Sequence, residues 1–413
     1  MNCHNILYDG NEILTFGSNS CQGSGNFGQL GLGDAIDRNK PTLLMINKNI
    51  QQIICASTFT IIVTQDKSDG IIVFGSNEGG QLGLGDTKSR HEPTLLIMNQ
   101  KIRYIVCGSG LSYLLADNGE LFVFGFNKFG QLGLGHNDNV YIPTLLMTDN
   151  GIKQIVCGAS HVFIIKTNGQ IFAIGYNSFG QLGLGDNINR NKPTLLMTDK
   201  NIREIVCGGF YTFIYKDNGE LYAFGDNRKG QLGLGDNIDR VGPTLLMTNR
   251  KIRQIVCGAD HSFILDSKYQ LFALGYNAFG QLGLGDNLNR YKPTLLMTDR
   301  GTRQIICGRY HTLIYKNNGD LYTFGLNFSG QLGLGDNIDR NIPTLLATNE
   351  NFVSINGKII NKIEWDPEIF DTLSEIKKYQ IINFLSVCCY YKQYHKINMI
   401  KYMRHLIIRF LFN

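Results

Sequence analysis

Residues 153–197 read KQIVCGASHVFIIKTNGQIFAIGYNSFGQLGLGDNINRNKPTLLM, and this text is one copy of a unit that recurs along most of the chain. Every copy contains the run QLGLG, and successive runs begin 50 or 52 residues apart, at Gln29, Gln81, Gln131, Gln181, Gln231, Gln281 and Gln331. Self-similarity at a fixed period of this length indicates stacked copies of one supersecondary unit. The repeat therefore predicts a single repeat domain rather than several unrelated ones.

One copy predicts four strands. Residues 152–158 are apolar almost throughout, which is typical of an inner strand covered on both faces. Residues 161–165 and 171–175 follow, joined by Asn168-Gly169, a dipeptide that favours a tight hairpin turn. The fourth strand, 193–197, opens on a proline in all seven copies. Proline has no N–H to donate, so we expect this strand at the outer edge of its sheet.

The two ends of the repeat region predict ring closure. A four-stranded sheet of this composition cannot bury both faces alone, whereas seven such sheets around an axis can. Residues 5–8 and 12–17 supply a second and a third strand without a first, and residues 352–356 supply a first strand alone. The prediction is an all-β fold, a seven-bladed β-propeller over residues 1–357, closed by N- and C-terminal strands that share one blade. A short α-helical C-terminal tail is expected over residues 358–413.

The tail has its own sequence character. Trp365-Asp366-Pro367-Glu368 is typical of a helix start, with a capping aspartate, a proline in the first turn and an acid at the positive end. Residues 397–412 separate a basic stripe from an apolar one at helical spacing. Three interpretations stay open: docking on the propeller, a partner-binding helix, or contact with a membrane surface.

Composition and charge narrow the class of protein. The formal net charge is +5, but seven basic residues and no acid follow Glu375, so the first 375 residues sum to about −2. That balance argues against a broad nucleic-acid surface on the repeat domain. No apolar stretch is long enough for a spanning helix, and residues 1–10 lack the apolar core of a signal peptide. We expect an intracellular protein, cytoplasmic or nuclear and not secreted.

The cysteines follow the repeat, which favours reduced thiols. Equivalent residues in successive repeats lie on different blades, too far apart for a disulfide. We expect them to act as small buried hydrophobes rather than metal ligands. These cysteines are Cys55, Cys107, Cys157, Cys207, Cys257 and Cys307.

Three motifs that resemble chemical sites are better explained by structure. Residues 23–28 match G-x-G-x-x-G, but a loop and not a helix follows, so a phosphate site is not expected. His161, His261 and His311 share a position with apolar residues in other copies, which favours core packing. No Ser/His/Asp or Cys/His constellation is visible.

An Asp and an Arg recur four residues apart in six QLGLGD loops, which predicts a charge-assisted bond within each loop. The pairs are Asp34/Arg38, Asp86/Arg90, Asp186/Arg190, Asp236/Arg240, Asp286/Arg290 and Asp336/Arg340. The third copy departs from the pattern, with His136 and Val140.

Five basic residues occupy one position at the start of the inner strand and form the candidate binding site. Sevenfold geometry places them in an arc around one mouth of the central channel, where they would attract an acidic loop or an anion. The alternative is that each is paired within its own loop, for instance with Asp149, Asp199 or Asp299 of the preceding turn. The five residues, called the basic arc below, are Arg103, Lys153, Arg203, Arg253 and Arg303; Gln51 and Val353 take this position in the other two copies.

The pattern I-x-C-G-x-x-H, then N-G, then F-G-x-N-x-x-G-Q-L-G-L-G-D and a proline resembles the regulator of chromosome condensation repeat family. The resemblance covers residues 1–357 and implies a seven-bladed propeller. It also implies a role as a guanine-nucleotide exchange factor, a chromatin-binding platform, a ciliary scaffold or an adaptor domain of a ubiquitin ligase. The regularity of the repeats resembles members from large DNA viruses or amoebae.

Two departures from the founding member bear on function. Its exchange activity uses a β-wedge inserted in one blade, whereas the longest insertion here is six residues, within 18–29. Its basic amino-terminal tail reaches DNA, whereas residues 1–17 contain no Lys or Arg. We therefore expect a monomeric, non-catalytic protein-interaction scaffold without cofactor, metal or small-molecule substrate, which binds a protein partner through one propeller face. A guanine-nucleotide exchange factor for a small GTPase, or its relic, and a substrate adaptor of a ubiquitin ligase are the alternatives.

Overall fold

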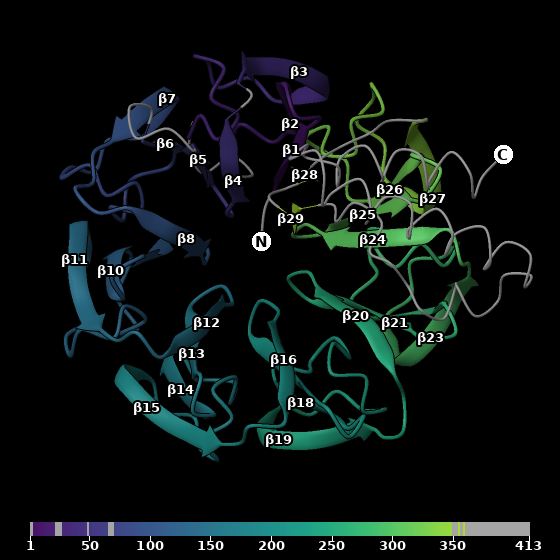
Figure 1. Ribbon diagram of the computed structural model, residues 1–413. Helices are drawn as coiled ribbons and strands as arrows, with labels where there is room; N and C mark the ends of the chain where they lie inside the picture. The colour runs from purple at the N-terminus through teal and green to yellow at the C-terminus, as the bar shows by residue number, and fades with distance from the viewer. Residues whose placement is uncertain are drawn as a thin grey trace, which may run out of the picture. The chain divides into compact units, whose positions relative to one another are not determined.

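The computed structural model describes residues 3–20, 27–47, 49–64, 70–348, 354–355 and 358–359. These residues belong to a compact unit that spans Met1–Ile360. Within the described ranges every regular element is a β-strand, and the strands form seven sheets arranged around an axis (Figure 1). The predicted seven-bladed β-propeller is confirmed.

Six of the seven sheets contain an inner, a second, a third and an outer strand in chain order, and each strand pairs with the next. The inner strands are β4 (Ile50–Cys55), β8 (Ile102–Cys107), β12 (Ile152–Cys157), β16 (Ile202–Cys207), β20 (Ile252–Cys257) and β24 (Thr302–Cys307). The second strands are β1 (His4–Tyr8), β5 (Phe59–Thr64), β9 (Leu111–Ala116), β13 (His161–Lys166), β17 (Tyr211–Lys216), β21 (His261–Asp266) and β25 (His311–Lys316).

The remaining two positions complete each blade. The third strands are β2 (Glu12–Gly17), β6 (Ile71–Gly75), β10 (Glu120–Gly125), β14 (Gln170–Gly175), β18 (Leu221–Gly225), β22 (Gln270–Gly275) and β26 (Leu321–Gly325). The outer strands are β3 (Arg38–Ile46), β7 (Arg90–Leu96), β11 (Val140–Thr148), β15 (Arg190–Thr198), β19 (Arg240–Met247), β23 (Arg290–Thr298) and β27 (Arg340–Ala347). Blade 1 contains β1 to β3, blade 2 contains β4 to β7, and numbering continues to blade 7, β24 to β27.

Blade 1 combines both ends of the repeat region, as expected. Its inner strand is β28 (Ser354–Ile355), which pairs antiparallel with β1 so that Leu7 lies opposite Ile355. A further short strand, β29 (Lys358–Ile359), extends this sheet beyond β28 and was not anticipated from the sequence. The ring therefore closes through hydrogen bonds between segments about 350 residues apart in the chain.

The hydrophobic core lies between blades rather than within one sheet. Second strands are buried along almost their whole length, because their alternate side chains pack against the blades on either side. Phe163 of blade 4 and Phe224 of blade 5, for example, meet edge to face with ring centroids 6.4 Å apart. Each interface of this kind exists only while both blades are present, so neighbouring blades stabilise one another.

The inner strands differ from the prediction. Full burial on both faces is wrong, because in β12 only Ile152 and Ile155 are buried, while Lys153 and Gln154 are exposed. An inner strand is an edge of its sheet and borders the propeller axis (Figure 1), so side chains that point toward the axis have no opposing sheet to cover them. The half-buried repeat cysteines at the ends of these strands follow from the same geometry, and burial raises the pKa of the unbridged Cys107 thiol to about 12.

The outer strands are edge strands, as the prolines predicted, but they begin earlier than expected. β15 starts at Arg190, three residues before Pro193. Its register with β14 shifts between Ala173 and Gly175, and Pro193 falls within that irregularity. A bulge of this kind accommodates a residue that cannot donate to the ladder.

The connections define two faces of the propeller. In blade 4, residues 158–160 and 176–189 connect strands at one end of the sheet, called here the loop face. Residues 167–169 and 199–201 connect strands at the opposite end, called here the turn face. The same division applies to each blade, because its strands alternate in direction. Predictions for Trp365–Glu368, for residues 397–412 and for Val353 lie outside the described residues.

Candidate functional site

The long loop of each blade is held by its own polar side chains. In blade 4, the buried Asn177 donates from Nδ2 to the backbone oxygen of Asp186 and accepts the Leu182 N–H at Oδ1, both at 2.9 Å. Gln181 accepts the Phe179 N–H at 3.0 Å. These contacts recur across the blades and explain why N-x-x-G-Q-L is repeated. The hydrogen bonds within the loop therefore give the repeated motif a structural role.

The six predicted Asp–Arg pairs all form. In blade 4, Arg190 Nη2 lies 2.5 Å from Asp186 Oδ2, and this hydrogen bond holds the pKa of the Asp186 carboxyl below its usual range. Equivalent pairs occur in blades 1, 2, 5, 6 and 7. In blade 3, His136 replaces the aspartate, and its Nδ1 accepts the Asp138 N–H at 3.2 Å. The histidine therefore keeps the loop's local hydrogen bond but loses the charge pair.

The repeat histidines lie between blades and are buried, as their interchange with apolar residues predicted. His161 Nε2 lies 3.1 Å from Thr212 Oγ1 of the next blade, and that hydroxyl donates to the Gln181 carbonyl at 3.0 Å. Because the hydroxyl proton is already used, Nε2 must carry the imidazole proton. The glycine of the C-G motif is also explained, since a Cβ on Gly158 would lie 2.1 Å from His161 Cε1.

The histidine contact makes these side chains structural and not catalytic. His161 Nδ1 has no hydrogen-bond partner in its buried position, so a second proton would place a charge where nothing accepts it. Burial lowers the pKa of His161 to about 3. Burial likewise lowers the pKa of His4, His261 and His311 to about 3, and these side chains contact Thr60, Thr312 and Asn5 respectively.

The basic arc lies at β-bulges on the turn-face ends of the inner strands. In β12 the register with β13 passes from Ile152 directly to Gln154, which leaves Lys153 as the extra residue. Each member of the arc occupies this position in its own blade. Four of the five side chains are exposed and Arg303 is half-buried. The structure therefore places the five residues at equivalent positions on neighbouring blades.

The three aspartates named for the loop-internal pairs bond lysines of the second strands. Asp149 is 2.7 Å from Lys166, and this hydrogen bond lowers the pKa of the Asp149 carboxyl. Asp199 and Asp299 likewise pair with the lysine that ends the second strand, Lys216 in one blade and Lys316 in the other. The interpretation that these aspartates pair with the arc is wrong, because that lysine reaches the same turn from the adjacent strand.

The loop face bears a continuous series of aromatic side chains that the sequence analysis did not single out. Ring–ring contacts connect Phe129 of blade 3 to Tyr176 of blade 4 at 4.6 Å, and Tyr176 to Phe210 of blade 5 at 5.5 Å. Tyr276 of blade 6 contacts Tyr310 of blade 7 at 5.9 Å. Basic side chains of blade 5 join the two parts. The members, called here the aromatic arc, are Phe126, Phe129, Tyr176, Phe179, Phe210, Arg228, Lys229, Tyr276, Phe279 and Tyr310.

The aromatic arc arises at positions where the repeats differ from one another. The first and third of the three variable residues of G-x-N-x-x-G are aromatic in blades 3, 4 and 6, but they are Ser76 and Gly79 in blade 2. The aromatic side chains are only half-buried. Since blade 2 forms the same loop without them, the fold does not require aromatic residues here.

A group of charges lies within the aromatic arc at blade 5. The almost fully buried carboxylate of Asp226 pairs with Arg228 at 2.7 Å, and the Arg228 guanidinium lies 4.3 Å from the Phe179 ring centroid. Desolvation, followed by the nearby charge of Asp226, raises the pKa of Asp260 from 3.8 to about 6. A perturbed carboxyl beside an exposed cation and aromatic rings is characteristic of a recognition site.

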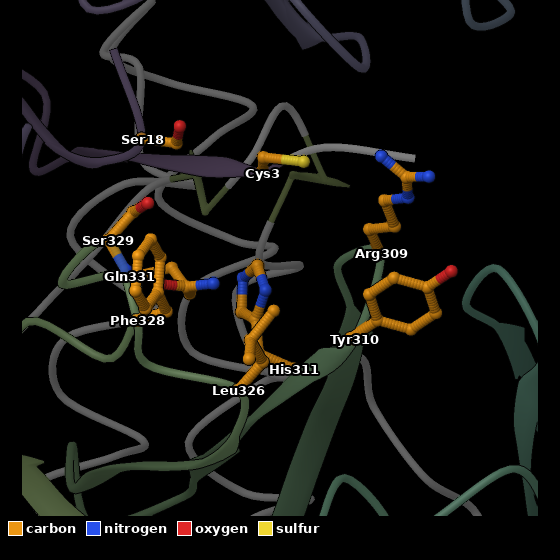
Figure 2. Close-up of a pocket in the computed structure, with 9 residues that line it drawn as sticks. All are labelled: Cys3, Ser18, Arg309, Tyr310, His311, Leu326, Phe328, Ser329 and Gln331. Carbon is orange, nitrogen blue, oxygen red and sulfur yellow. Dashed lines mark hydrogen bonds between the residues drawn. The ribbon is translucent and has the colours of Figure 1, made fainter. Parts of the chain in front are cut away.

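The aromatic arc ends beside a small pocket between blades 7 and 1. Figure 2 shows Phe328, Gln331 and His311 around this pocket, with Arg309 and Tyr310 at one side. Phe328 is 70% exposed, which is unusual for a phenylalanine and places a large apolar surface at the rim. Cys3 and Ser18 of blade 1 complete the lining.

Replacing Asp260 with asparagine is expected to stabilise the propeller near neutral pH. The pKa of Asp260 is about 6 in the folded protein, above the ordinary value of 3.8. The stability that Asp260 contributes is therefore fully present below pH 3.8 and is lost as the pH rises through about 6. Asparagine carries no charge, so D260N should gain about 1–3 kcal/mol at about pH 7, a range lowered for partial exposure. Urea unfolding followed by circular dichroism measures the free energy of unfolding, and the difference between D260N and wild type should be smaller near pH 5.5. A difference that does not depend on pH would contradict the raised pKa of Asp260.

Two kinds of feature are absent from the part of the chain that the structure describes. Within the described ranges, no group of three or more His, Cys, Asp or Glu side chains is placed to hold a metal ion. In the same ranges, no helix has the length and apolar character needed to span a bilayer.

Comparison with known families assigns the repeat. The profile described as RCC1-like domain matches residues 3–252 and 150–359, which together cover the propeller. The chain belongs to the RCC1-like domain family. This agrees with the resemblance carried by the C-G-x-x-H and G-Q-L-G-L-G-D motifs, and with the seven blades that the structure contains.

Relatives with RCC1-like sequences are much longer than the segment they share with this chain. The X-linked retinitis pigmentosa GTPase regulator of Canis lupus familiaris is 34% identical over 122 residues, which is 28% of this chain and 11% of that protein. The probable E3 ubiquitin-protein ligase HERC4 of Homo sapiens is 36% identical over 107 residues, 25% of this chain and 10% of the ligase. The matched segments therefore span about a tenth of these relatives.

A solved RCC1-like structure shares the fold. Prp20p of Saccharomyces cerevisiae superposes with a TM-score of 0.71 at 21% identity, covering 83% of this chain and 88% of that one. The aromatic arc was missed in the sequence because its members lie in separate repeats and make contact only in the closed ring. A comparison of the repeats at the variable positions of G-x-N-x-x-G would have found it.

Proposed function

We propose that the protein is a non-catalytic interaction scaffold that binds a protein partner through the aromatic arc on its loop face. One observation carries this proposal: half-buried aromatic rings and exposed cations form a connected surface over blades 3 to 7, although the same loops form without them in blade 2. Aromatic and arginine side chains contribute most of the binding energy in many protein interfaces. Prp20p, which shares the fold, has been characterised for its binding to Gsp1p and histones, and this supports a protein partner here.

Shortening the aromatic side chains tests the proposal. The partner is first isolated by affinity capture on the intact protein and identified by mass spectrometry. Its dissociation constant is then measured by biolayer interferometry for wild type and for the double variant Tyr276→Ala and Phe279→Ala. Loss of two aromatic contacts at the centre of an interface should weaken binding at least roughly tenfold.

The matched control is Tyr291→Ala, which removes a partly exposed tyrosine from an outer strand outside the aromatic arc. This variant should bind like wild type. If the arc variant binds normally, or if both variants lose binding equally, the aromatic arc is not the partner site. Acceleration of nucleotide release from a captured small GTPase would assign exchange activity instead of a passive scaffold.

A further inference from the structure

The pocket between blades 7 and 1 exists because two side chains of the loop face are smaller there than their equivalents. Between blades 6 and 7 the two positions hold Tyr276 and Tyr310, whose ring centroids lie 5.9 Å apart. Between blades 7 and 1 the same positions hold Leu326 and Cys3, and both line the pocket. The space that remains is about 10 Å³, which is room for one group the size of a water molecule.

The polar group of this pocket is the side-chain amide of Gln331. Its Oε1 accepts the Ser329 N–H at 2.9 Å, which fixes the amide and leaves Nε2 as the donor. Gln331 is only 4% exposed, and among the described residues no hydrogen bond engages Nε2. Figure 2 shows this nitrogen directed toward the ring of His311, which also lines the pocket. A donor in so buried a position requires an acceptor.

Blade 2 shows which group such an amide binds. There Ser76 takes the place of Leu326, and Gln81 Nε2 donates to the Ser76 hydroxyl at 3.0 Å. Gln81 Oε1 accepts the Gly79 N–H at 2.9 Å, which is the contact that Gln331 makes in its own loop. The two loops therefore hold the amide in the same way, and blade 7 lacks the oxygen that blade 2 supplies.

The histidine of the pocket favours a hydroxyl over a carboxylate. Asn5 Nδ2 donates to the Gln331 carbonyl at 2.6 Å, so its Oδ1 is the acceptor that lies 3.0 Å from His311 Nε2. The imidazole proton is therefore used, and burial lowers the pKa of His311 to about 3, which leaves the ring uncharged near neutral pH. A hydroxyl needs only the one donor that Gln331 offers. Because Arg309 also lines the pocket, a carboxylate is the competing ligand.

We infer that the pocket between blades 7 and 1 binds a serine or threonine side chain of the protein that occupies the aromatic arc. The inference rests on the proposed function, because Tyr310 belongs to both the aromatic arc and the pocket. The hydroxyl takes the place that the Ser76 hydroxyl holds in blade 2. The ring of Phe328, which is 70% exposed at the rim, offers apolar surface to the residues on either side.

Filling the pocket tests the inference. Short random peptides displayed on phage are selected on the wild-type protein, and the dissociation constants of the enriched peptides are measured by fluorescence anisotropy. Leu326→Tyr introduces the residue that blades 4 and 6 carry at this position, so the fold should tolerate the ring while the pocket is filled. This variant should bind the peptides at least roughly tenfold more weakly than wild type. Its melting temperature should stay close to that of wild type.

The peptides themselves report the chemistry of the ligand. They should share a Ser or Thr at one position, and replacing that residue with alanine should weaken binding to wild type roughly fivefold, the effect of one hydrogen bond. The same replacement should have no effect on binding to Leu326→Tyr, because the pocket is already filled. A shared Asp or Glu at that position, or an alanine replacement without effect on wild type, would overturn the inference.

Two control variants separate the pocket from the surrounding surface. Leu288→Tyr makes the same change at a residue that is 68% exposed in the loop of blade 6, and it should bind like wild type. Equal binding by both Leu→Tyr variants would refute the pocket as the site. The double variant Tyr276→Ala and Phe279→Ala tests the aromatic arc. If it alone weakens the peptides, the aromatic arc remains the partner site and the pocket does not; if neither does, or no peptide is enriched, both proposals fail.

Discussion

Lowering the pH from about 7 to about 4.5 is expected to unfold the propeller cooperatively, because four buried histidines oppose protonation. Each has a folded-state pKa of about 3 against an ordinary value of 6.5. The unfolded chain therefore takes up protons that the folded protein does not, and stability is lost as the pH falls below the higher value. Each histidine costs about 1.4 kcal/mol per pH unit, so four together cost on the order of 10 kcal/mol two units lower. That loss is comparable to the whole stability of a typical domain.

The protein contains its own control for this prediction. Between blades 3 and 4, Leu111 replaces the histidine and Val162 the threonine, both within one apolar cluster. Because Val162 has no hydroxyl to donate to the Gln131 carbonyl, that carbonyl instead accepts the Tyr113 hydroxyl at 2.7 Å. The histidine contact and the apolar contact thus occupy the same position between neighbouring blades, in different pairs of blades.

Three changes would give the interface between blades 4 and 5 the apolar contact that blades 3 and 4 share. They are His161→Leu, Phe163→Tyr and Thr212→Val. The variant should take up one proton fewer than wild type when it unfolds. The slope of its unfolding free energy against pH should therefore be lower by about 1.4 kcal/mol per pH unit between about pH 4.5 and 6. Urea unfolding followed by far-ultraviolet circular dichroism at several pH values measures the slope. His161→Leu alone is the comparison. A triple variant with an unchanged slope would show that His161 does not contribute to acid unfolding.

Removing the inner strand of blade 1 is expected to abolish a stable fold. Ile355 of β28 is fully buried and packs with Leu7 and Phe16 of its own blade and with Leu313 of blade 7. A chain that ends at Glu350 loses this strand and exposes apolar surface on two neighbouring blades, with an open strand edge between them. It should be insoluble or melt far below wild type, whereas a chain that ends at Ile363 should keep the fold.

A point substitution separates ring closure from the general effects of shortening the chain. Ile355→Asp places a carboxylate in the same buried position, and a buried charge without a partner costs about 3–5 kcal/mol. Leu295→Asp introduces the same charge at a residue that is 47% exposed and should change stability by only about 0.5 kcal/mol. Thermal unfolding of the three full-length proteins provides the comparison. If the chain that ends at Glu350 melts like wild type, the shared blade is not what closes the ring.

The sequence by itself determined the architecture, because each feature that specifies it is local and repeated. Glycine turns and edge prolines mark the strands of one blade, and counting strands at the two ends requires one shared blade. The Asp186–Arg190 pairing was also predictable, since the two residues lie within one loop and four positions apart. These features depend on short sequence separations, which a repeated motif displays directly.

The tertiary structure alone decided which side chains meet between blades. Lys166, and not Lys153, reaches Asp149, because adjacent strands bring the lysine to the turn while a bulge directs Lys153 elsewhere. Tyr176 meets Phe210, and His161 meets Thr212, across a boundary between blades. Such contacts depend on how far each blade is rotated against the next and on the direction of each side chain. Both are consequences of packing the closed ring, and neither is encoded in the period of the repeat.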